Sequence, residues 1–414
     1  MTLKVKERIE QIRRGEVPEG YKRTKAGIMP LDWCTEKEYK AKDIFKSVTN
    51  KKHNGEFEVL SATQDKGVIP RSQVDIDIKF DESNITGYKK VDRGDFVISL
   101  RSFQGGIEYS EYEGLVSPAY TVLKPIVPIC DGYYQAYLKT GDYINRLNKG
   151  TYGIRDGKQI GFEDFGDMIL HYPSLLEQEK ISEILSTQDK LIALKEKLIE
   201  EKKRQKKALM QQLLTGKKRL PGFSSDWVDV KLGDVFAERV ETNFQELELL
   251  SVTGTNGVVP RSTIETKDNS SEDKSKYLKI CKGDIGYNTM RMWQGVSALS
   301  NYEGIVSPAY TILIPSETIS AKYFSYLFKM HAVIFLFYRF SQGIVDDTRS
   351  LKYYEFAKLH LTVPSDKKEQ EAIADILTVA GKEIEILQKD LDQEKQKKKA
   401  LMQLLLTGIV RVTI

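Results

Sequence analysis

A long proline-free segment constrains this chain more than any other feature. Residues 175–216 contain no proline, and their one glycine is Gly216 at the end. Within the segment, Leu185, Ile192 and Ile199 recur every seventh residue on a charged background. Such spacing places aliphatic side chains on one face of a helix that packs against another helix. At about 1.5 Å per residue the helix would be roughly 60 Å long, so it needs a partner of similar length.

A second segment of the same chain supplies that partner. In residues 365–408, Leu377, Ile384 and Leu391 take the places of the three aliphatic residues named above. Both segments end in Ala-Leu-Met-Gln, then leucines, then Thr-Gly. Agreement over so long a stretch indicates internal duplication, not two surface helices that share a heptad by chance, and repeats decide the architecture before any other pattern. We therefore expect the two helices to pair antiparallel.

The segments between the helices are duplicated as well. LSATQDKGVIPRS at 60–72 matches LSVTGTNGVVPRS at 250–262, and residues 101–121 match 291–311. Short runs rich in Val, Ile, Tyr and Phe alternate there with Gly, Asn, Asp and Pro, a pattern typical of strands and turns. The predicted fold class is α+β, with two strand-rich globular domains separated by a pair of long antiparallel coiled-coil helices in a pseudo-twofold internal repeat.

The repeat divides the chain into successive segments. Val5, Ile9 and Ile12 stand at helical spacing before Gly15, so a short helix near the end of the helix pair would bring the two termini close together. The expected segments are 1–18 (an N-terminal helix packing near the end of the rod), 19–174 (first globular unit), 175–216 (central helix), 217–364 (second globular unit) and 365–414 (C-terminal helix).

Composition narrows the cellular context. The net charge is +4, but basic residues gather at 202–207 and 395–399, near one end of each long helix. Charge runs of this kind are usually a solvated face, although paired basic ends can also lie along a phosphate backbone. The three cysteines are scattered and form no CxxC, and no run approaches the ~20 apolar residues of a membrane span. We expect a cytoplasmic protein without a membrane segment, and the most apolar run, 331–338, has the length of a core element.

The chain shows no recognisable chemistry of its own. Its four histidines lack metal-ligand spacing, and we find no catalytic triad, P-loop or nuclease cluster. Ser117–Tyr120 and Ser307–Tyr310 superficially resemble the Asn-Pro-Pro-Tyr loop of adenine methyltransferases, but serine replaces the asparagine and alanine the second proline. We interpret this segment as the buried lead-in to a strand. No catalytic residue, metal or cofactor is expected in the chain.

Taken together, these features resemble the specificity subunit of Type I restriction-modification systems. They are the two strand-rich units, the helix ends ALMQQLLTG and ALMQLLLTG, the GLVSPAY and GIVSPAY segments, and the helix starts EQEKISEIL and EQEAIADIL. The resemblance covers essentially the whole chain. It implies that 19–174 and 217–364 are target recognition domains, each reading half of a bipartite site in double-stranded DNA. It further implies that the helices are a spacer and the docking site for two methyltransferase subunits, that restriction subunits join through the complex, and that any cofactors belong to the partners.

Side chains shared by both copies are the first candidates for DNA contacts. Arg71 and Arg261 follow proline in matching Gly-Val-Ile/Val-Pro-Arg-Ser loops, where arginine can grip phosphate or read guanine. A surface turn held by an ion pair would explain them equally well. A second pair of loops combines base-reading residue types with a glycine that permits close approach. Its members are Arg101 and Gln104 in the first copy and Arg291 and Gln294 in the second.

Residues that read different half-sites should differ between the copies. Lys66 lies in a turn where the second copy has Asn256, and later loops carry further candidates. Unconstrained surface loops would vary in the same way, so variation alone does not establish base reading. The candidates in the later loops are Tyr152, Arg155, Lys158 and Arg349.

Two other functional classes remain open from the sequence. A self-sufficient DNA methyltransferase would carry its own cofactor site, yet no glycine-rich loop follows a strand. A coiled-coil scaffold with protein-binding heads would show no salt-dependent affinity for duplex DNA. Exposed aliphatic helix faces also make self-association plausible when partners are absent.

Overall fold

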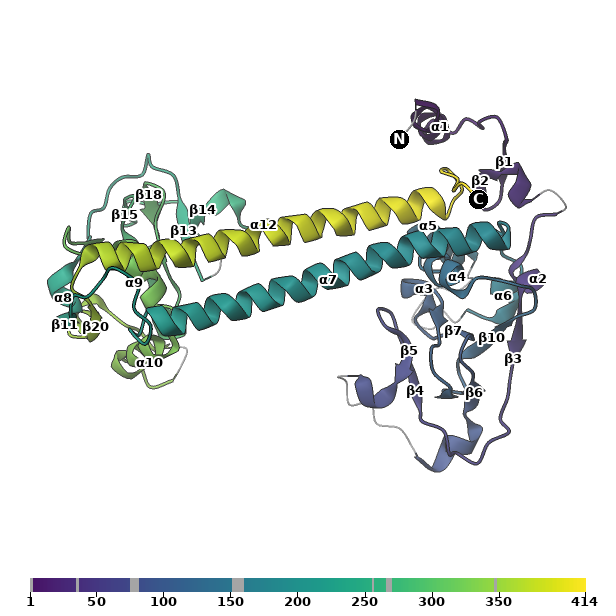
Figure 1. The fold of residues 1–414 in the computed structure, drawn as a ribbon, viewed down its shortest axis with the longest axis horizontal. Coiled ribbons are helices and arrows are strands. Elements are labelled where there is room, and N and C mark those ends of the chain that lie inside the picture. The colour runs from purple at the N-terminus through teal and green to yellow at the C-terminus, as the bar shows by residue number, and fades with distance from the viewer. Residues whose placement is uncertain are drawn as a thin grey trace. The chain divides into compact units, whose positions relative to one another are not determined.

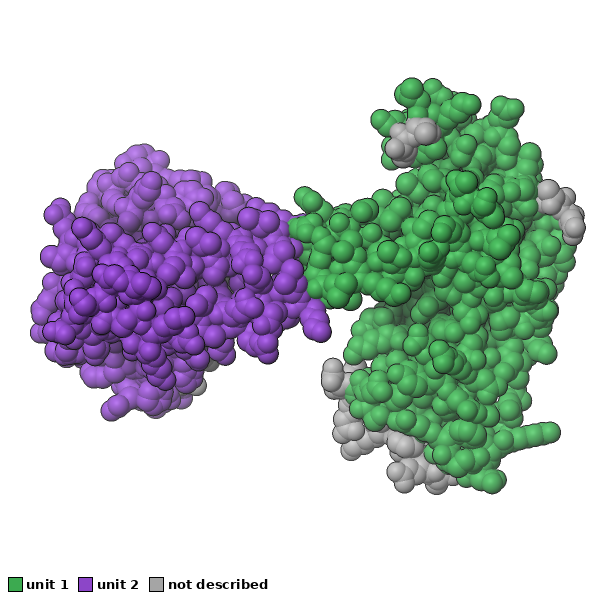
Figure 2. All heavy atoms as spheres, viewed as in Figure 1, with its two compact units in different colours: residues 1–195, 390–414 green, residues 196–389 purple. Residues whose placement is uncertain are grey.

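The computed structural model describes residues 3–34, 37–74, 82–150, 160–254, 257–265, 270–345 and 348–414. The chain forms two compact units (Figure 2). Unit 1 comprises residues 1–195 and 390–414, and unit 2 comprises residues 196–389. Each unit contains one strand-rich globule and a part of each long helix.

In unit 1 the described strands are short and alternate with brief helices (Figure 1). The strands are β1 (Tyr21–Thr24), β2 (Gly27–Pro30), β3 (Phe45–Val48), β4 (Leu60–Thr63), β5 (Gly67–Pro70), β6 (Lys89–Val91), β7 (Phe96–Ile98), β8 (Glu108–Tyr109), β9 (Gly114–Val116) and β10 (Thr121–Pro125). The helices are α1 (Leu3–Arg13), η1 (Leu31–Trp33), α2 (Ala41–Ile44), η2 (Arg71–Gln73), η3 (Glu82–Gly87), α3 (Ser102–Gly105), α4 (Asp131–Tyr137), α5 (Gly141–Gly150), α6 (Phe162–Gly166) and the long α7 (Leu175–Leu213), which continues into unit 2.

Unit 2 repeats this order of elements. Its strands are β11 (Trp227–Lys231), β12 (Phe236–Glu238), β13 (Leu250–Thr253), β14 (Gly257–Pro260), β15 (Leu278–Ile280), β16 (Ile285–Asn288), β17 (Ser297–Leu299), β18 (Gly304–Val306), β19 (Tyr310–Pro315) and β20 (His360–Pro364). Its helices are α8 (Leu232–Val235), η4 (Arg261–Thr263), η5 (Met292–Gln294), α9 (Ala321–Leu327), α10 (His331–Phe340), α11 (Tyr353–Phe356) and the long α12 (Lys367–Leu405), which continues into unit 1.

The two globules share a four-stranded sheet and a hairpin, but β1 pairs with β2 in unit 1, whereas β11 pairs with β20 in unit 2. A four-stranded antiparallel sheet runs β3-β10-β7-β8 in unit 1 and β12-β19-β16-β17 in unit 2. Each globule adds a hairpin with the same register, since Leu60 pairs with Pro70 in β4–β5 and Leu250 with Pro260 in β13–β14. The α+β fold class and the internal duplication predicted from the sequence are therefore confirmed.

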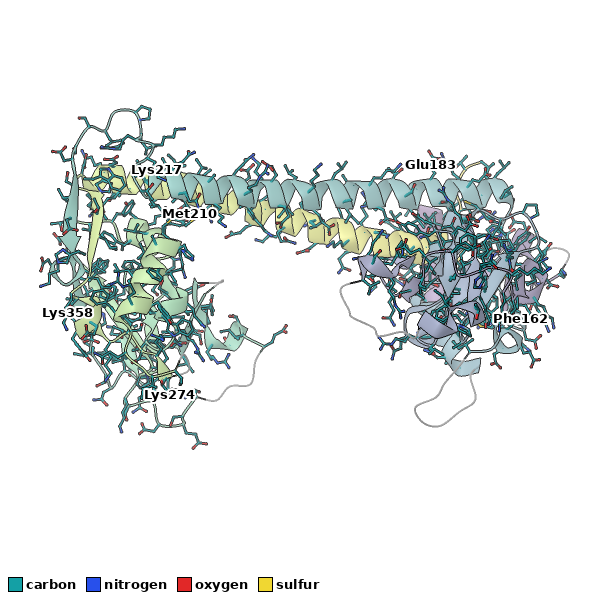
Figure 3. All side chains as sticks on the ribbon, turned by 90° about the horizontal axis from the view of Figure 1, so that it is seen from below. Phe162, Glu183, Met210, Lys217, Lys274 and Lys358 are labelled. Atoms are coloured by element: carbon teal, nitrogen blue, oxygen red, sulfur yellow. The ribbon has the colours of Figure 1, made fainter. Side chains whose placement is uncertain are left out.

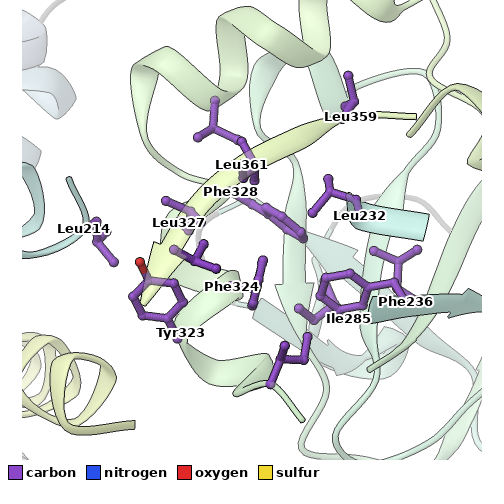
Figure 4. Packing of buried hydrophobic residues seen from close by; sticks show 14 of the residues in the cluster. Leu214, Leu232, Phe236, Ile285, Tyr323, Phe324, Leu327, Phe328, Leu359 and Leu361 are labelled. Atoms are coloured by element: carbon purple, nitrogen blue, oxygen red, sulfur yellow. The ribbon is translucent and has the colours of Figure 1, made fainter. Parts of the chain in front are cut away.

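Aromatic residues fill the main core of each globule, but the two cores use different ones. In unit 1, helices α4 and α5 bury Tyr133, Tyr134 and Tyr143. In unit 2, Phe324 of α9 and the adjacent Phe328 pack against each other in the same role, and Figure 4 shows them in the unit 2 core. The shared topology thus tolerates a phenol-rich core in one copy and a phenyl-rich core in the other.

The long helices pair antiparallel within each unit. In unit 1, Lys195 forms an ion pair with Asp390, and farther along Lys398 lies 2.5 Å from Asp189. In unit 2, Lys202 lies 2.5 Å from Glu383. The partner numbers fall as the α7 numbers rise, which defines opposite directions. Figure 3 shows α7 running from Glu183 to Met210, with Lys217 just beyond its end.

The predicted heptad residues are buried to different depths, and Leu185 and Leu377 belong to the cores of units 1 and 2. Leu185 and Ile199 of α7 and Leu377 and Leu391 of α12 are buried. Ile192 and Ile384 are half-buried. Leu198, which shares the aliphatic stripe of α7, is largely exposed. The apolar seam is therefore narrower than the full stripe, as in a coiled coil.

Both chain termini lie at one end of α12 (Figure 1). Tyr21 donates its hydroxyl hydrogen bond to the Gly408 carbonyl at 2.8 Å, and Arg8 of α1 donates to the Ile409 carbonyl at 3.1 Å. These contacts join the first and last segments of unit 1. Across the described residues, no helix combines the length and apolarity needed to cross a bilayer.

Candidate nucleic-acid interface

In unit 1 two loops far apart in sequence pack against each other. The β4–β5 turn carries Gln64, whose Nε2 donates to Oε1 of Gln104 in α3 at 3.4 Å. A Cβ added at Gly105 would lie 2.7 Å from Cγ of Gln64, so a larger residue there would displace the Gln64 side chain. Lys66 is exposed in the same turn. The structure thereby brings the predicted residues Lys66 and Gln104 to neighbouring loops.

Two of the predicted arginines act on one tyrosine. Burial raises the pKa of Tyr120, and the positive charges of Arg71 and Arg101 oppose that rise. In unit 2 burial likewise raises the pKa of Tyr310, with Arg261 opposing. The guanidinium groups therefore lie close enough to a phenol, at the start of β10 or β19, for their charges to be felt there. In unit 1 Arg71 and Arg101 thus act on the same phenol, and in unit 2 Arg261 acts on the matching one.

The backbone holds the first of these arginines in the same way in both units. The Arg71 amide donates to the Val59 carbonyl at 2.9 Å, and the Arg261 amide donates to the Leu249 carbonyl at 2.8 Å. Each arginine also begins a 3₁₀ turn directly after the hairpin proline. Proline fixes the chain direction entering the turn, so the side chain leaves the hairpin at the same place in each globule.

A lysine that the sequence interpretation did not select lies beneath the loops of unit 1. Lys139, just after α4, donates to the Gln64 carbonyl at 3.1 Å and forms an ion pair with buried Glu108. Burial raises the pKa of the Glu108 carboxyl, and the hydrogen bond and charge of Lys139 oppose this. Lys139 thus ties the β4–β5 turn to the sheet.

In unit 2 the equivalent lysine has a different environment. Lys329 donates to the Gly295 carbonyl at 2.6 Å, and Ala298 stands where unit 1 has Glu108. Burial lowers the pKa of Lys329 to about 8. Gly295 adopts φ +80°, and a Cβ there would lie 2.7 Å from Cδ1 of Ile334 in α10. The loop with exposed Gln294 and half-buried Arg291 is therefore seated directly on α10.

The remaining predicted residues have separate outcomes. Arg349 lies over the ring of Tyr338, 4.1 Å from its centroid, and its Nη2 donates to the Tyr338 hydroxyl at 3.2 Å. The other candidates fall outside the described residues. They are Tyr152, Arg155, Lys158 and Asn256.

One expectation from the sequence is corrected. The Ser-Pro-Ala-Tyr segments do lead into β10 and β19, but Pro118 and Pro308 are exposed, because the segment turns at the surface before the strand. The apolar run 331–338 is only partly core. Phe337 is buried, whereas Phe335 is 55% exposed. Helical geometry sends these two side chains to different faces of α10, and only one face is covered.

The duplicated loops carry exposed carboxamides at Gln104 and Gln294, and of their four shared arginines Arg101 is exposed while the other three are half-buried. Arginine donates in bidentate fashion to phosphate or guanine, and glutamine pairs with adenine edges. Among the described residues, no group of three or more His, Cys, Asp or Glu side chains is arranged to hold a metal ion. The residue types gathered here are those that contact phosphates and base edges in nucleic acid.

Comparison with known proteins identifies the family. Residues 35–204 and 224–395 each match the family model of the Type I restriction modification DNA specificity domain. The chain belongs to this family. Each match covers most of one globule and much of the long helix that follows it. The chain is accordingly a DNA-recognition subunit with two specificity domains.

Individual relatives agree with this assignment. The specificity subunit of the Type I restriction enzyme MjaVIII from Methanocaldococcus jannaschii is 25% identical over 351 residues, which cover 78% of this chain and 80% of that protein. The HsdS subunit from Thermoanaerobacter tengcongensis superposes with a TM-score of 0.51 at 13% identity, covering 95% of this chain and 98% of that one. The Type I S subunit from M. genitalium gives a TM-score of 0.50 at 14% identity, covering 91% and 96%.

Proposed function

We propose that this specificity-domain protein is the non-catalytic recognition subunit of a Type I restriction-modification complex. Each globule reads one half of a bipartite site in double-stranded DNA. The assignment rests on one observation above all. The same loops carry Arg71, Arg101 and Gln104 in one copy and Arg261, Arg291 and Gln294 in the other, on four-stranded sheets of matching strand order.

We assign the target recognition domains to 19–174 and 217–364. The helices at 175–216 and 365–414 act as the spacer between them and as docking sites for two methyltransferase subunits, and restriction subunits join through that complex. The methyl donor and nucleotide cofactors are bound by the partners. The assembly acts on chromosomal DNA, which places it in the cytoplasm. When its partners are absent, the chain self-associates through exposed aliphatic residues such as Leu194 and Ile386.

Co-expression with the methyltransferase subunit tests this function. Modified adenines are mapped across the host genome with and without this chain. A split motif that depends on the chain is the expected result. A continuous motif would mean that one globule alone reads DNA, and no new methylation from a soluble, associated pair would contradict the proposal.

Two controls separate the rival functions. Methyl transfer by the purified chain with methyl donor and DNA would show a self-sufficient methyltransferase. A flat dependence of duplex affinity on salt would favour a protein-binding scaffold, because phosphate contacts release counterions and give a steep slope.

A further inference from the structure

Unit 2 carries a group of aromatic rings at its Arg291–Gln294 loop, of which Phe335 and Tyr338 are exposed and Trp293 is half-buried. Trp293 of η5 lies 6.1 Å from Tyr338 of α10 between ring centroids, and Tyr338 lies 6.4 Å from Phe335, nearly parallel to it. The Trp293 indole donates to the Met290 carbonyl at 2.9 Å, which holds the ring in place. We call Trp293, Phe335 and Tyr338 the aromatic platform.

The platform lies on the side of α10 that the core does not use. Val333 and Phe337 bury one side of this helix, whereas Phe335 is 55% and Tyr338 37% exposed. A solvent-facing side of a helix normally carries polar residues, and a group of exposed rings marks a binding surface. The core of unit 2 would be complete without Phe335 and Tyr338.

Positive charge surrounds these rings. The Arg349 guanidinium covers one side of Tyr338, Arg339 is exposed at the next position of α10, and Arg291 begins the loop that holds Trp293. An apolar surface flanked by guanidinium groups complements a ligand that is anionic along its backbone and apolar at its bases. Duplex DNA has this chemistry, and arginines can take the phosphates while rings contact the bases.

Unit 1 supplies an internal comparison. Its α5 occupies the place of α10, with Tyr143 and Leu147 buried where unit 2 buries Val333 and Phe337. At the two platform positions of this helix, unit 1 has Asn145 and Asn148. Because the same fold accepts asparagine at both positions, the aromatic residues of unit 2 are not required by the fold.

We propose that the aromatic platform is a base-contacting surface specific to unit 2, which packs against the apolar surface of bases in its half-site. That surface is either a thymine methyl group in the major groove or the face of an unstacked base. Unit 1 has asparagine at the two α10 positions of the platform and Phe103 at the position of Trp293. The inference rests on the proposed function of the two globules.

The test exchanges residues between the two copies. The variant Phe335→Asn/Tyr338→Asn gives unit 2 the residues of unit 1, and Asn145→Phe/Asn148→Tyr is the reciprocal variant. Val240→Asn removes an apolar side chain of unit 2 that is 68% exposed and lies outside the platform, as the control. Each is co-expressed with the methyltransferase subunit, and modified adenines are mapped across the genome.

We expect the two double variants to alter different halves of the split motif and the control to alter neither. The unit 2 variant should become tolerant at one or more positions, with discrimination there reduced ~10-fold or more, the usual effect of one base contact. An unchanged motif, or equal changes in both halves, would overturn the inference. Loss of methyltransferase co-purification with an intact melting temperature would also overturn it, by making the platform a protein-docking surface.

Binding to duplex oligonucleotides identifies the contact. Thymines of the altered half are replaced by uracil, which lacks the methyl group. If the wild-type complex binds the uracil duplex more weakly than the thymine duplex, and the Phe335→Asn/Tyr338→Asn complex binds both equally, the platform contacts a thymine methyl. If the wild-type complex binds both duplexes equally and the variant complex binds both more weakly, the platform contacts the face of a base. If the wild-type chain yields no split motif, the proposed function itself fails, before the platform is tested.

Discussion

Arg411 forms a double hydrogen bond with Glu177 at the start of α7, Nε to Oε1 at 2.6 Å and Nη2 to Oε2 at 2.8 Å. Arg219 grips Glu369 at the start of α12 with the same atoms, at 2.7 and 2.8 Å. In each unit the arginine follows the end of one long helix and the glutamate begins the other. Each unit thus joins a helix end to a helix start through a single buried carboxylate.

Removing either arginine should destabilise its own unit. Glu369 is 0% exposed, so Arg219→Met leaves a buried carboxylate without its bidentate partner. We expect unit 2 to lose about 3 kcal/mol of unfolding free energy, the usual cost of breaking a buried pair. Denaturant unfolding followed by aromatic fluorescence measures the change. The control Arg204→Met removes an exposed ion pair with Glu201 and should cost less than about 1 kcal/mol.

The stability of unit 1 should fall with acid through His171. Burial lowers the pKa of this imidazole to about 4, although Nδ1 donates to the Leu406 carbonyl at 2.8 Å. The ordinary pKa of histidine is about 6.5. Between pH 6.5 and pH 4, the unfolded state therefore binds a proton at His171 that the folded state does not bind. The contribution of neutral His171 to the stability of unit 1 is complete above pH 6.5 and is lost as the pH falls toward 4.

The expected loss between pH 6.5 and 4 is roughly 3 kcal/mol, from the size of the pKa shift. It is measured as the difference in unfolding free energy between wild type and His171→Gln across that range. Carboxylates titrate equally in both proteins and cancel. A difference that stays constant with pH would contradict a buried neutral imidazole.

The Lys139–Glu108 pair should respond unequally to removal of its two members. Lys139→Met strands the buried Glu108 carboxylate at neutral pH and should cost about 3 kcal/mol. Glu108→Ala imitates Ala298 of unit 2 and leaves Lys139 its hydrogen bond to the Gln64 carbonyl, as Lys329 keeps its bond to Gly295. The Glu108→Ala substitution should lower the free energy of unfolding by about 1 kcal/mol. Equal losses in denaturant unfolding would argue against this asymmetry.

The shared arginines and the glutamines should affect DNA binding differently. Arg71→Ala and Arg261→Ala should weaken specific and unrelated duplexes alike and make the slope of log affinity against log salt shallower by about 1 each, the result of losing one phosphate contact. Lys25→Ala, on the exposed β1–β2 turn, is the control and should leave the slope unchanged.

Gln104→Ala and Gln294→Ala should instead relax one motif position each, in different halves of the site. The salt slope should stay that of wild type, because a carboxamide contact to a base edge releases no counterion. The measurement is binding to duplexes that differ at single positions of the mapped motif. Uniform weakening on every duplex would assign the glutamines to the backbone.

The sequence by itself determined the architecture. Seven-residue spacing at Leu185, Ile192 and Ile199 predicts a helix that pairs with another helix. The same spacing at 377–391 identifies the segment with which it pairs. The duplication also predicted two strand-rich units, and turn residues such as Gly67 and Gly257 recur at matching places in them. These properties are local periodicities, which a chain displays before it folds.

Only the tertiary structure decided which side chains meet and which faces stay uncovered. Gln64 meets Gln104, and Arg411 meets Glu177 across 234 positions of sequence, because strand order and chain closure bring them together. The same holds for exposure, since half of the apolar run that contains Phe335 faces solvent. Periodicity assigns residues to faces, but burial depends on whether another element packs on that face, and that is a property of the assembled fold.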